Sequence, residues 1–174
     1  MGRRADQIDR FTQWSREHGE AVRGYLLAML RRPDLADDFT QEVFCRAWQA
    51  RSRYHEQGTA RAYLLRIADR LVGDWWRKAG RERTLDEEGW KQKEPVSRTA
   101  EPFQSLARAE AASQLAAALD RLSPAQRRVL LLRYYGDLSF AEIAEIIHCP
   151  VSTTLSHCRR GLLALRKLLV ESAL

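Results

Sequence analysis

Cysteine is scarce in this chain, with three residues among 174. An odd number of cysteines at irregular spacing argues against a disulfide framework, so we expect a reduced, cytoplasmic protein. Cys45 stands alone, whereas the pairs His148-Cys149 and His157-Cys158 bring a histidine beside each of the other two. Their spacing matches no common zinc motif, so a metal site is the less favoured alternative. We expect Cys149 and Cys158 to be small buried apolar residues instead.

Long hydrophobic runs are also absent. The first 14 residues are polar and charged, without the apolar centre of a signal peptide. No apolar run approaches the roughly 20 residues that span a bilayer. The sequence therefore predicts a soluble protein with no stable membrane insertion.

Strand signals are nearly absent, whereas Ala, Leu, Arg and Glu recur at helical spacing. The five prolines fall between the periodic runs, where they mark helix boundaries. We expect helices at about Ile8–Arg31, Asp34–Ala50, Thr59–Arg77, Phe103–Arg121, Pro124–Tyr135, Ser139–His148 and Val151–Glu171. Residues 84–102 are polar, hold two prolines and lack an apolar period. The prediction is an all-α protein with two small helical domains, 1–83 and 103–174, joined by a flexible linker at 84–102.

Charge is unevenly distributed within a net excess of +6. Residues 34–42 hold four acids and no Lys or Arg. Residues 59–83 hold seven bases against three acids, and residues 121–174 hold eight bases against four acids. One acidic helix and two basic segments favour a protein partner together with a nucleic acid.

The segment from Leu138 to Arg160 has the pattern of a helix-turn-helix. Ser139 and Glu142 have the spacing of a capping box, which starts a helix. A short turn at 148–150 follows, and a second helix then begins near Ser152.

Projection of this second helix at about 100° per residue separates two faces. One face should be core: Thr154, Leu155, Cys158, Leu162, Leu165 and Leu169. The other carries hydroxyls and cations, which suit base edges and phosphates in a major groove. Its candidate DNA-binding residues are Ser152, Thr153, Ser156, His157, Arg159 and Arg160, with Lys167 nearby. The alternative is an ordinary amphipathic helix with a solvated face.

Two motifs resemble those of bacterial sigma factors. Leu122-Ser-Pro-Ala-Gln-Arg-Arg-Val-Leu-Leu-Leu-Arg, followed by Glu142-Ile-Ala-Glu, resembles the start of the family's fourth conserved region. Asp38-Phe-Thr-Gln-Glu-Val-Phe-Cys-Arg-Ala-Trp resembles its second region. In the fourth region, His148 stands where the family usually has glycine, at a position that often needs a left-handed backbone. Leu155 stands where the family often has a cation.

The second-region motif also forms a polar face. Asp38, Gln41 and Glu42 fall within about 100° of one another on a helix, while Phe39, Val43, Phe44 and Trp48 should pack inward or at the edges. The resemblance implies that the polar face docks on the largest subunit of core RNA polymerase. The alternative is that acids near a helix start complement the helix dipole, which accounts for part of the role of Asp37 and Asp38 but not for Gln41.

The helix expected at Thr59–Arg77 contains Arg61-Ala-Tyr-Leu-Leu-Arg-Ile-Ala-Asp-Arg-Leu-Val-Gly-Asp. This stretch resembles the family's promoter-melting segment. Projection predicts a core arc of Leu64, Ile67, Leu71 and Trp75, flanked by Leu65, Val72 and Trp76. The opposite arc combines an aromatic ring with guanidinium groups, which suits a single strand; it comprises Tyr63, Arg66, Arg70, Asp74 and Arg77. Tyr63 replaces the usual Trp, and Arg70 replaces a common Asn. In the family, the loop equivalent to 52–58 lines a pocket for a flipped base.

The order and spacing of both motifs identify the chain as a member of the small, extracytoplasmic-function (ECF) group of sigma factors. The resemblance implies binding to core RNA polymerase and promoter DNA, with minus-ten contacts from the melting helix and minus-thirty-five contacts from the helix-turn-helix. It also implies regulation by an anti-sigma factor. We expect no cofactor and no enzymatic activity, since no nucleophile constellation, P-loop or metal spacing is present. A one-component helix-turn-helix regulator is the alternative, but it leaves the motif at 38–48 unexplained.

Overall fold

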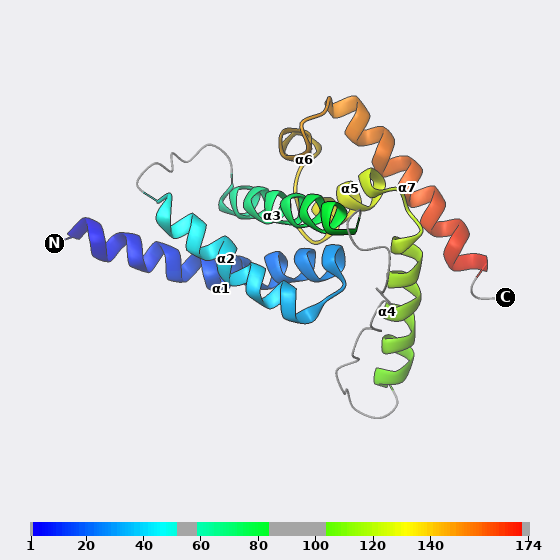
Figure 1. Ribbon diagram of the computed structural model, residues 1–174, viewed down its shortest axis with the longest axis horizontal. Helices are drawn as coiled ribbons and strands as arrows, with labels where there is room; N and C mark the ends of the chain where they lie inside the picture. The colour runs from blue at the N-terminus through cyan, green and yellow to red at the C-terminus, as the bar shows by residue number, and fades with distance from the viewer. Residues whose placement is uncertain (1, 52–58, 84–103, 172–174) are drawn as a thin grey trace. The chain divides into compact units, whose positions relative to one another are not determined.

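The computed structural model describes residues 2–51, 59–83 and 104–171, and all regular secondary structure in these ranges is helical (Figure 1). The helices pack as two units, α1–α3 and α4–α7. Their bounds are α1 Gly2–Leu30, α2 Pro33–Gln49, α3 Ala60–Arg83, α4 Gln104–Asp120, α5 Pro124–Tyr134, α6 Phe140–Ile147 and α7 Val151–Glu171. The predicted all-α fold is confirmed. The predicted linker at 84–102 and the loop at 52–58 lie outside the described residues.

Helix ends agree with the sequence prediction within about two residues, except at two places. Helix α1 begins at Gly2 instead of Ile8, and α3 continues to Arg83 instead of ending at Arg77. Both extensions consist mainly of good helix formers, which in the second offset the cost of Gly80. Residues with low apolar content thus extend helices that periodicity alone truncates.

Serine residues cap two helices, and the capping box predicted at Ser139 is confirmed. Ser123 precedes Pro124 at the start of α5, and its hydroxyl accepts a hydrogen bond from the Gln126 amide. Ser139 does the same for the Glu142 amide at the start of α6, and both helices have complete capping boxes. His148 ends α6 in the left-handed region, with φ 56° and ψ 50°, as the usual glycine at this position predicts.

In the first unit, α1 packs against both α2 and α3, which also pack against each other. The core is aliphatic apart from Tyr25 and Asp69; it includes Val22, Leu26, Val43, Ala47, Leu64, Leu65 and Ala68. At its edge, Phe11 makes edge-on ring contacts with Phe44 and Trp48, at centroid distances of 5.8 and 5.2 Å. Phe44 and Trp48 therefore pack at the border of the core, as expected for them.

The prediction that Trp75 is core and Trp76 core or boundary was wrong. Trp75 is half-buried, and Trp76 is 47% exposed. The two rings meet edge to face with centroids 4.8 Å apart. Burial along α3 ends at Val72, and the described side chains beyond Asp74 are half-buried or exposed. Helical projection gives the side of a helix that is apolar, but not the length over which a neighbouring helix covers it.

In the second unit, α7 packs against α4, α5 and α6. The core contains Val129, Leu130, Leu131, Leu132, Leu138, Ile143, Ile146 and Cys158. Burial raises the pKa of the Cys158 thiol, in keeping with its predicted place in the core. Cys149 is only half-buried; its Sγ lies 3.2 Å from Thr154 Oγ1.

The predicted core face of α7 was partly wrong, because Leu155 is 46% and Leu162 is 42% exposed. The buried line instead follows Thr154, Cys158 and Gly161. A Cβ atom on Gly161 would lie 2.9 Å from Leu130 Cδ1, so α7 approaches α5 closely at this glycine. The centre of the buried face is therefore turned by roughly 40° from the predicted one, away from Leu155 and Leu162.

Candidate protein- and nucleic-acid-binding surfaces

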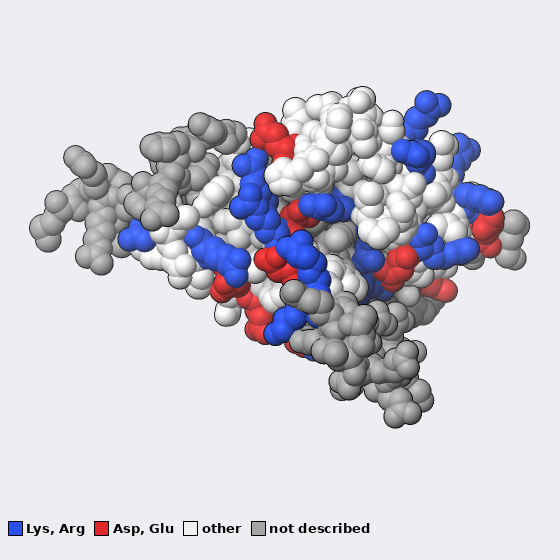
Figure 2. Space-filling view, turned by 45° about the horizontal axis from the view of Figure 1, so that its top comes forward, with Lys and Arg blue, Asp and Glu red and all other residues white. Residues whose placement is uncertain are grey.

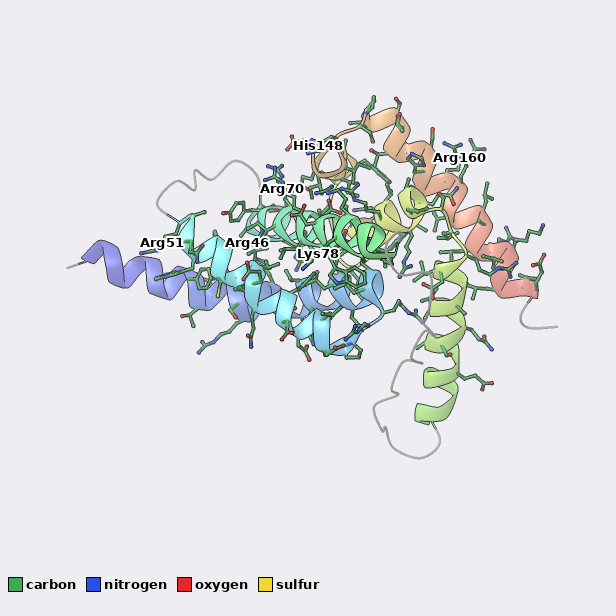
Figure 3. The ribbon with its side chains drawn as sticks, viewed as in Figure 1. Arg46, Arg51, Arg70, Lys78, His148 and Arg160 are labelled. Carbon is green, nitrogen blue, oxygen red and sulfur yellow. The ribbon has the colours of Figure 1, made fainter. Side chains whose placement is uncertain are left out.

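The predicted polar face of α2 is largely exposed. Asp38 and Gln41 are exposed, and within the described part of the chain neither has a hydrogen bond or an ion pair. Glu42 is half-buried, and its Oε1 accepts a hydrogen bond of 2.7 Å from Arg46 Nε, one turn later. Figure 3 marks Arg46 on α2. The face therefore presents one unpaired carboxylate beside a surface ion pair.

The other acids near the start of α2 have partners within the first unit. Asp37 Oδ1 accepts a hydrogen bond of 2.6 Å from Arg23 Nε on α1, and Asp34 pairs with Arg32. The Arg32 guanidinium lowers the pKa of the Asp34 carboxyl. These two acids thus have structural partners, which leaves Asp38 as the acid that is available to a second protein.

The same face includes residues that the sequence analysis did not single out. Cys45 and Gln49 are exposed. They follow Asp38 by seven and eleven residues, which places them within about 20° of it around the helix. Continuing the projection of this helix beyond Glu42 would have found them.

Tyr63 packs against α1 rather than standing alone on α3. Its ring centroid lies 6.3 Å from that of Trp14 at a tilt of 60°, and both side chains are half-buried. Partial burial raises the pKa of the Tyr63 phenol. No periodicity signal in the sequence links Trp14 to this position, because the contact depends on how α1 packs against α3.

The cations of this face differ in their surroundings. Arg70 is exposed and, among the described residues, has no polar partner (Figure 3). Arg66 is half-buried, whereas Asp74 and Arg77 form an exposed ion pair one turn apart. Asp74 therefore offsets part of the positive charge near Arg77, whereas Arg70 is an exposed cation without such a partner among the described residues.

Helix α7 exposes most of its predicted DNA-binding residues. Ser152, Ser156, Arg159 and Arg160 are exposed, and Thr153 and His157 are half-buried at the edges. The Ser156 hydroxyl donates 2.9 Å to the Ser152 carbonyl, and Arg160 Nε donates 3.3 Å to the Ser156 carbonyl. Hydroxyl oxygens and the remaining guanidinium N–H groups stay available to a ligand. Basic side chains cover more of the visible charged surface than acidic ones do (Figure 2).

Two further observations concern other classes of site. The described residues contain no group of three His, Cys, Asp or Glu side chains placed to hold a metal ion. Among the same residues, no helix combines the length and apolar character needed to cross a membrane.

Comparison with known proteins gives matches in both units. Residues 14–82 match the family profile of sigma-70 region 2, and residues 112–165 match that of sigma-70, region 4. The ECF RNA polymerase sigma factor SigX of Bacillus subtilis is 28% identical over 145 residues, which cover 82% of this chain and 75% of SigX. The ECF RNA polymerase sigma factor SigK of Mycobacterium bovis is 30% identical over 152 residues, or 85% of this chain and 79% of SigK.

Solved structures show the same fold. The sigma factor RpoE of Bartonella quintana, in complex with the anti-sigma factor NepR, superposes with a TM-score of 0.79 at 22% identity; the match covers 92% of this chain and 96% of RpoE. Together, the two profile matches in this order define a protein of the sigma-70 class. The chain belongs to the ECF group of RNA polymerase sigma factors, the proteins that direct transcription initiation.

Proposed function

We propose that the three exposed faces divide the work of initiation. Asp38, Gln41 and Glu42 on α2 bind core RNA polymerase. The face of α3 binds the unpaired minus-ten strand, and α7 binds the minus-thirty-five duplex. What supports this assignment above all is that each face lies within a matched sigma region and exposes side chains of suitable chemistry. The chain performs no covalent step and needs no cofactor, and it acts in the cytoplasm with the polymerase.

Promoter opening follows from selective binding. The α3 residues of this surface are Tyr63, Arg66, Arg70, Asp74 and Arg77. A surface that binds an unpaired strand better than a duplex shifts the equilibrium toward the open state. Aromatic stacking at Tyr63 and phosphate neutralisation at Arg70 supply this preference without reading every base.

Duplex recognition is assigned to the start of α7. There Ser152, Thr153, Ser156 and His157 lie beside base edges, and Arg159 and Arg160 bind phosphates, since the first residues of a recognition helix enter the major groove. We also propose the domain limits 1–83 and 103–174, with 84–102 as the connection that lets the two units bind separate promoter elements.

An anti-sigma factor is the proposed regulator. RpoE was solved with NepR, and the structure of CnrH, with a TM-score of 0.66, contains the cytosolic domain of CnrY. By analogy, such a partner would cover surfaces that this chain needs for polymerase or DNA.

The test is transcription in vitro by core polymerase, with and without the chain, on a fragmented genomic library. We expect a small set of start sites that appear only with the chain and share two upstream elements. Binding of the chain to DNA in the absence of core, with no new start sites in its presence, would instead indicate a one-component regulator.

A further inference from the structure

The first two turns of α7 expose aliphatic side chains beside the proposed DNA-binding residues. Val151 is 43% and Leu155 is 46% exposed. They are one helical turn apart, and Leu155 lies within about 60° of both Ser152 and Arg159 around the helix. Thr154, the neighbour of Leu155, is fully buried. The surface next to Ser152 is therefore apolar, although a solvated helix face would usually be polar here.

Leu155 also lies near the end of α7 that approaches DNA in a helix-turn-helix. Helix α7 begins at Val151, directly after the turn that His148 closes. In a helix-turn-helix, the first residues of the second helix approach base edges in the major groove. Leu155, in the second turn, lies close enough to this end to meet a base pair.

The major groove offers one apolar group, the 5-methyl group of thymine; its other features are hydrogen-bond donors and acceptors. Serine hydroxyls both donate and accept, so Ser152 and Ser156 discriminate weakly by themselves. A leucine side chain has no polar atom, so it favours a methyl group and leaves a facing donor or acceptor without a partner.

We propose that Leu155, flanked by Val151, contacts the methyl group of one thymine in the upstream duplex and makes the protein prefer thymine at that position. The inference rests on the proposed function of α7 in binding duplex DNA. It adds an apolar specificity contact to a surface whose other proposed contacts are polar.

The experiment uses holoenzyme and the upstream element obtained by selection from randomised promoters. Each thymine of the element is replaced in turn by uracil, which lacks the methyl group. At one position, uracil should weaken wild-type binding about fourfold, the equivalent of about 0.8 kcal/mol for burial of one methyl group. Equal binding to thymine and uracil at every position would overturn the proposal.

Substitutions at Leu155 test whether this residue causes the difference between thymine and uracil. Leu155→Ala should abolish the difference between thymine and uracil. Leu155→Arg should abolish it as well and steepen the salt dependence by about one unit, because it adds a phosphate contact. Leu163→Ala is the matched control, since Leu163 is 59% exposed on the same helix two turns later, and it should keep the fourfold difference. A difference that persists in both Leu155 variants contradicts the proposal.

The outcome also separates this inference from the function on which it rests. If selection yields an upstream element but no position depends on the methyl group, only the role of Leu155 is wrong. If holoenzyme selects no upstream sequence, the proposed role of α7 is wrong and the inference fails with it.

Discussion

The hydroxyl of Tyr25 on α1 donates a hydrogen bond of 2.7 Å to Asp69 Oδ1 on α3. Tyr25 is fully buried and Asp69 is only 4% exposed, so the bond lies inside the first unit. Asp69 directly precedes Arg70, an exposed cation of the α3 face without a polar partner among the described residues. The bond therefore fixes α1 to the part of α3 that presents this face.

Tyr25→Phe should destabilise the first unit by about 1–2 kcal/mol, because it removes the donor of a buried hydrogen bond without removing much apolar volume. Urea denaturation followed by circular dichroism measures the change. Tyr134→Phe is the control, since Tyr134 is 65% exposed and should leave stability unchanged. A Tyr25→Phe protein as stable as wild type would contradict the assigned importance of this bond.

Charge reversal on α2 tests polymerase binding. Asp38→Lys together with Glu42→Lys should weaken the affinity for core polymerase, measured by fluorescence anisotropy of labelled core, while the fold persists. The loss of the Glu42–Arg46 pair should cost at most about 0.5 kcal/mol of stability because that pair is on the surface. The matched control is Glu17→Lys with Glu20→Lys on α1, which changes net charge equally. Equal weakening by both double variants would indicate a general charge effect.

Arg70→Ala should impair promoter opening, because it removes an exposed cation without a partner in the described structure. Permanganate reactivity of unpaired thymines in the minus-ten region measures opening. Arg16→Ala, an exposed arginine on α1, is the control. Normal opening by the Arg70 variant would exclude it from the melting surface.

Trp75→Ala should cost about 1–2 kcal/mol of stability, less than the roughly 3–5 kcal/mol of a fully buried tryptophan, because Trp75 is half-buried.

The serine and arginine residues of the α7 surface should have different effects on DNA binding. Ser152→Ala with Ser156→Ala should change the preferred minus-thirty-five sequence. Arg159→Ala with Arg160→Ala should weaken all sequences about equally and reduce the salt slope by roughly one unit per lost phosphate contact. Binding of holoenzyme across salt concentrations and sequence variants measures both, with the exposed Arg121→Ala outside α7 as control. A reversed pattern would mean that the helix enters the groove in another orientation.

Gly161→Val should destabilise the second unit by about 1–3 kcal/mol, because the close approach of Leu130 leaves no room for a side chain. Leu163→Val, an exposed change two residues away, should alter stability by less than about 0.5 kcal/mol. Thermal denaturation compares the two variants. Equal stability would show that α5 and α7 separate at little cost.

Features set by local chemistry could be predicted from the sequence. The capping box at Ser139 depends on residues three apart, and the left-handed His148 depends on the turn between two helices. Contacts between distant segments could not be predicted from the sequence. The partner of Asp69 lies 44 residues away on α1, so a charged residue inside a helix gave no sign of its burial. The exposure of Leu155 likewise depends on where α5 approaches Gly161, which α7 alone does not reveal.

The same limit applies to the proposed surfaces. The exposure of Asp38, Arg70 and Ser152 follows from the polar side of each helix, and these residues are exposed as projected. The contact of Trp14 with Tyr63 arises only when α1 and α3 pack. Sequence reasoning therefore found which residues face solvent on a helix, but not which ring from another helix lies beside them.

The tryptophans described above have a practical consequence. All five tryptophans of the sequence precede residue 96, so none belongs to the unit of α4–α7. Selective excitation of indole therefore gives an intrinsic fluorescence signal that does not originate in α4–α7. A single strand bound near Trp75 or Trp76 on α3 should quench this emission directly, so its binding can be followed by titration without a label.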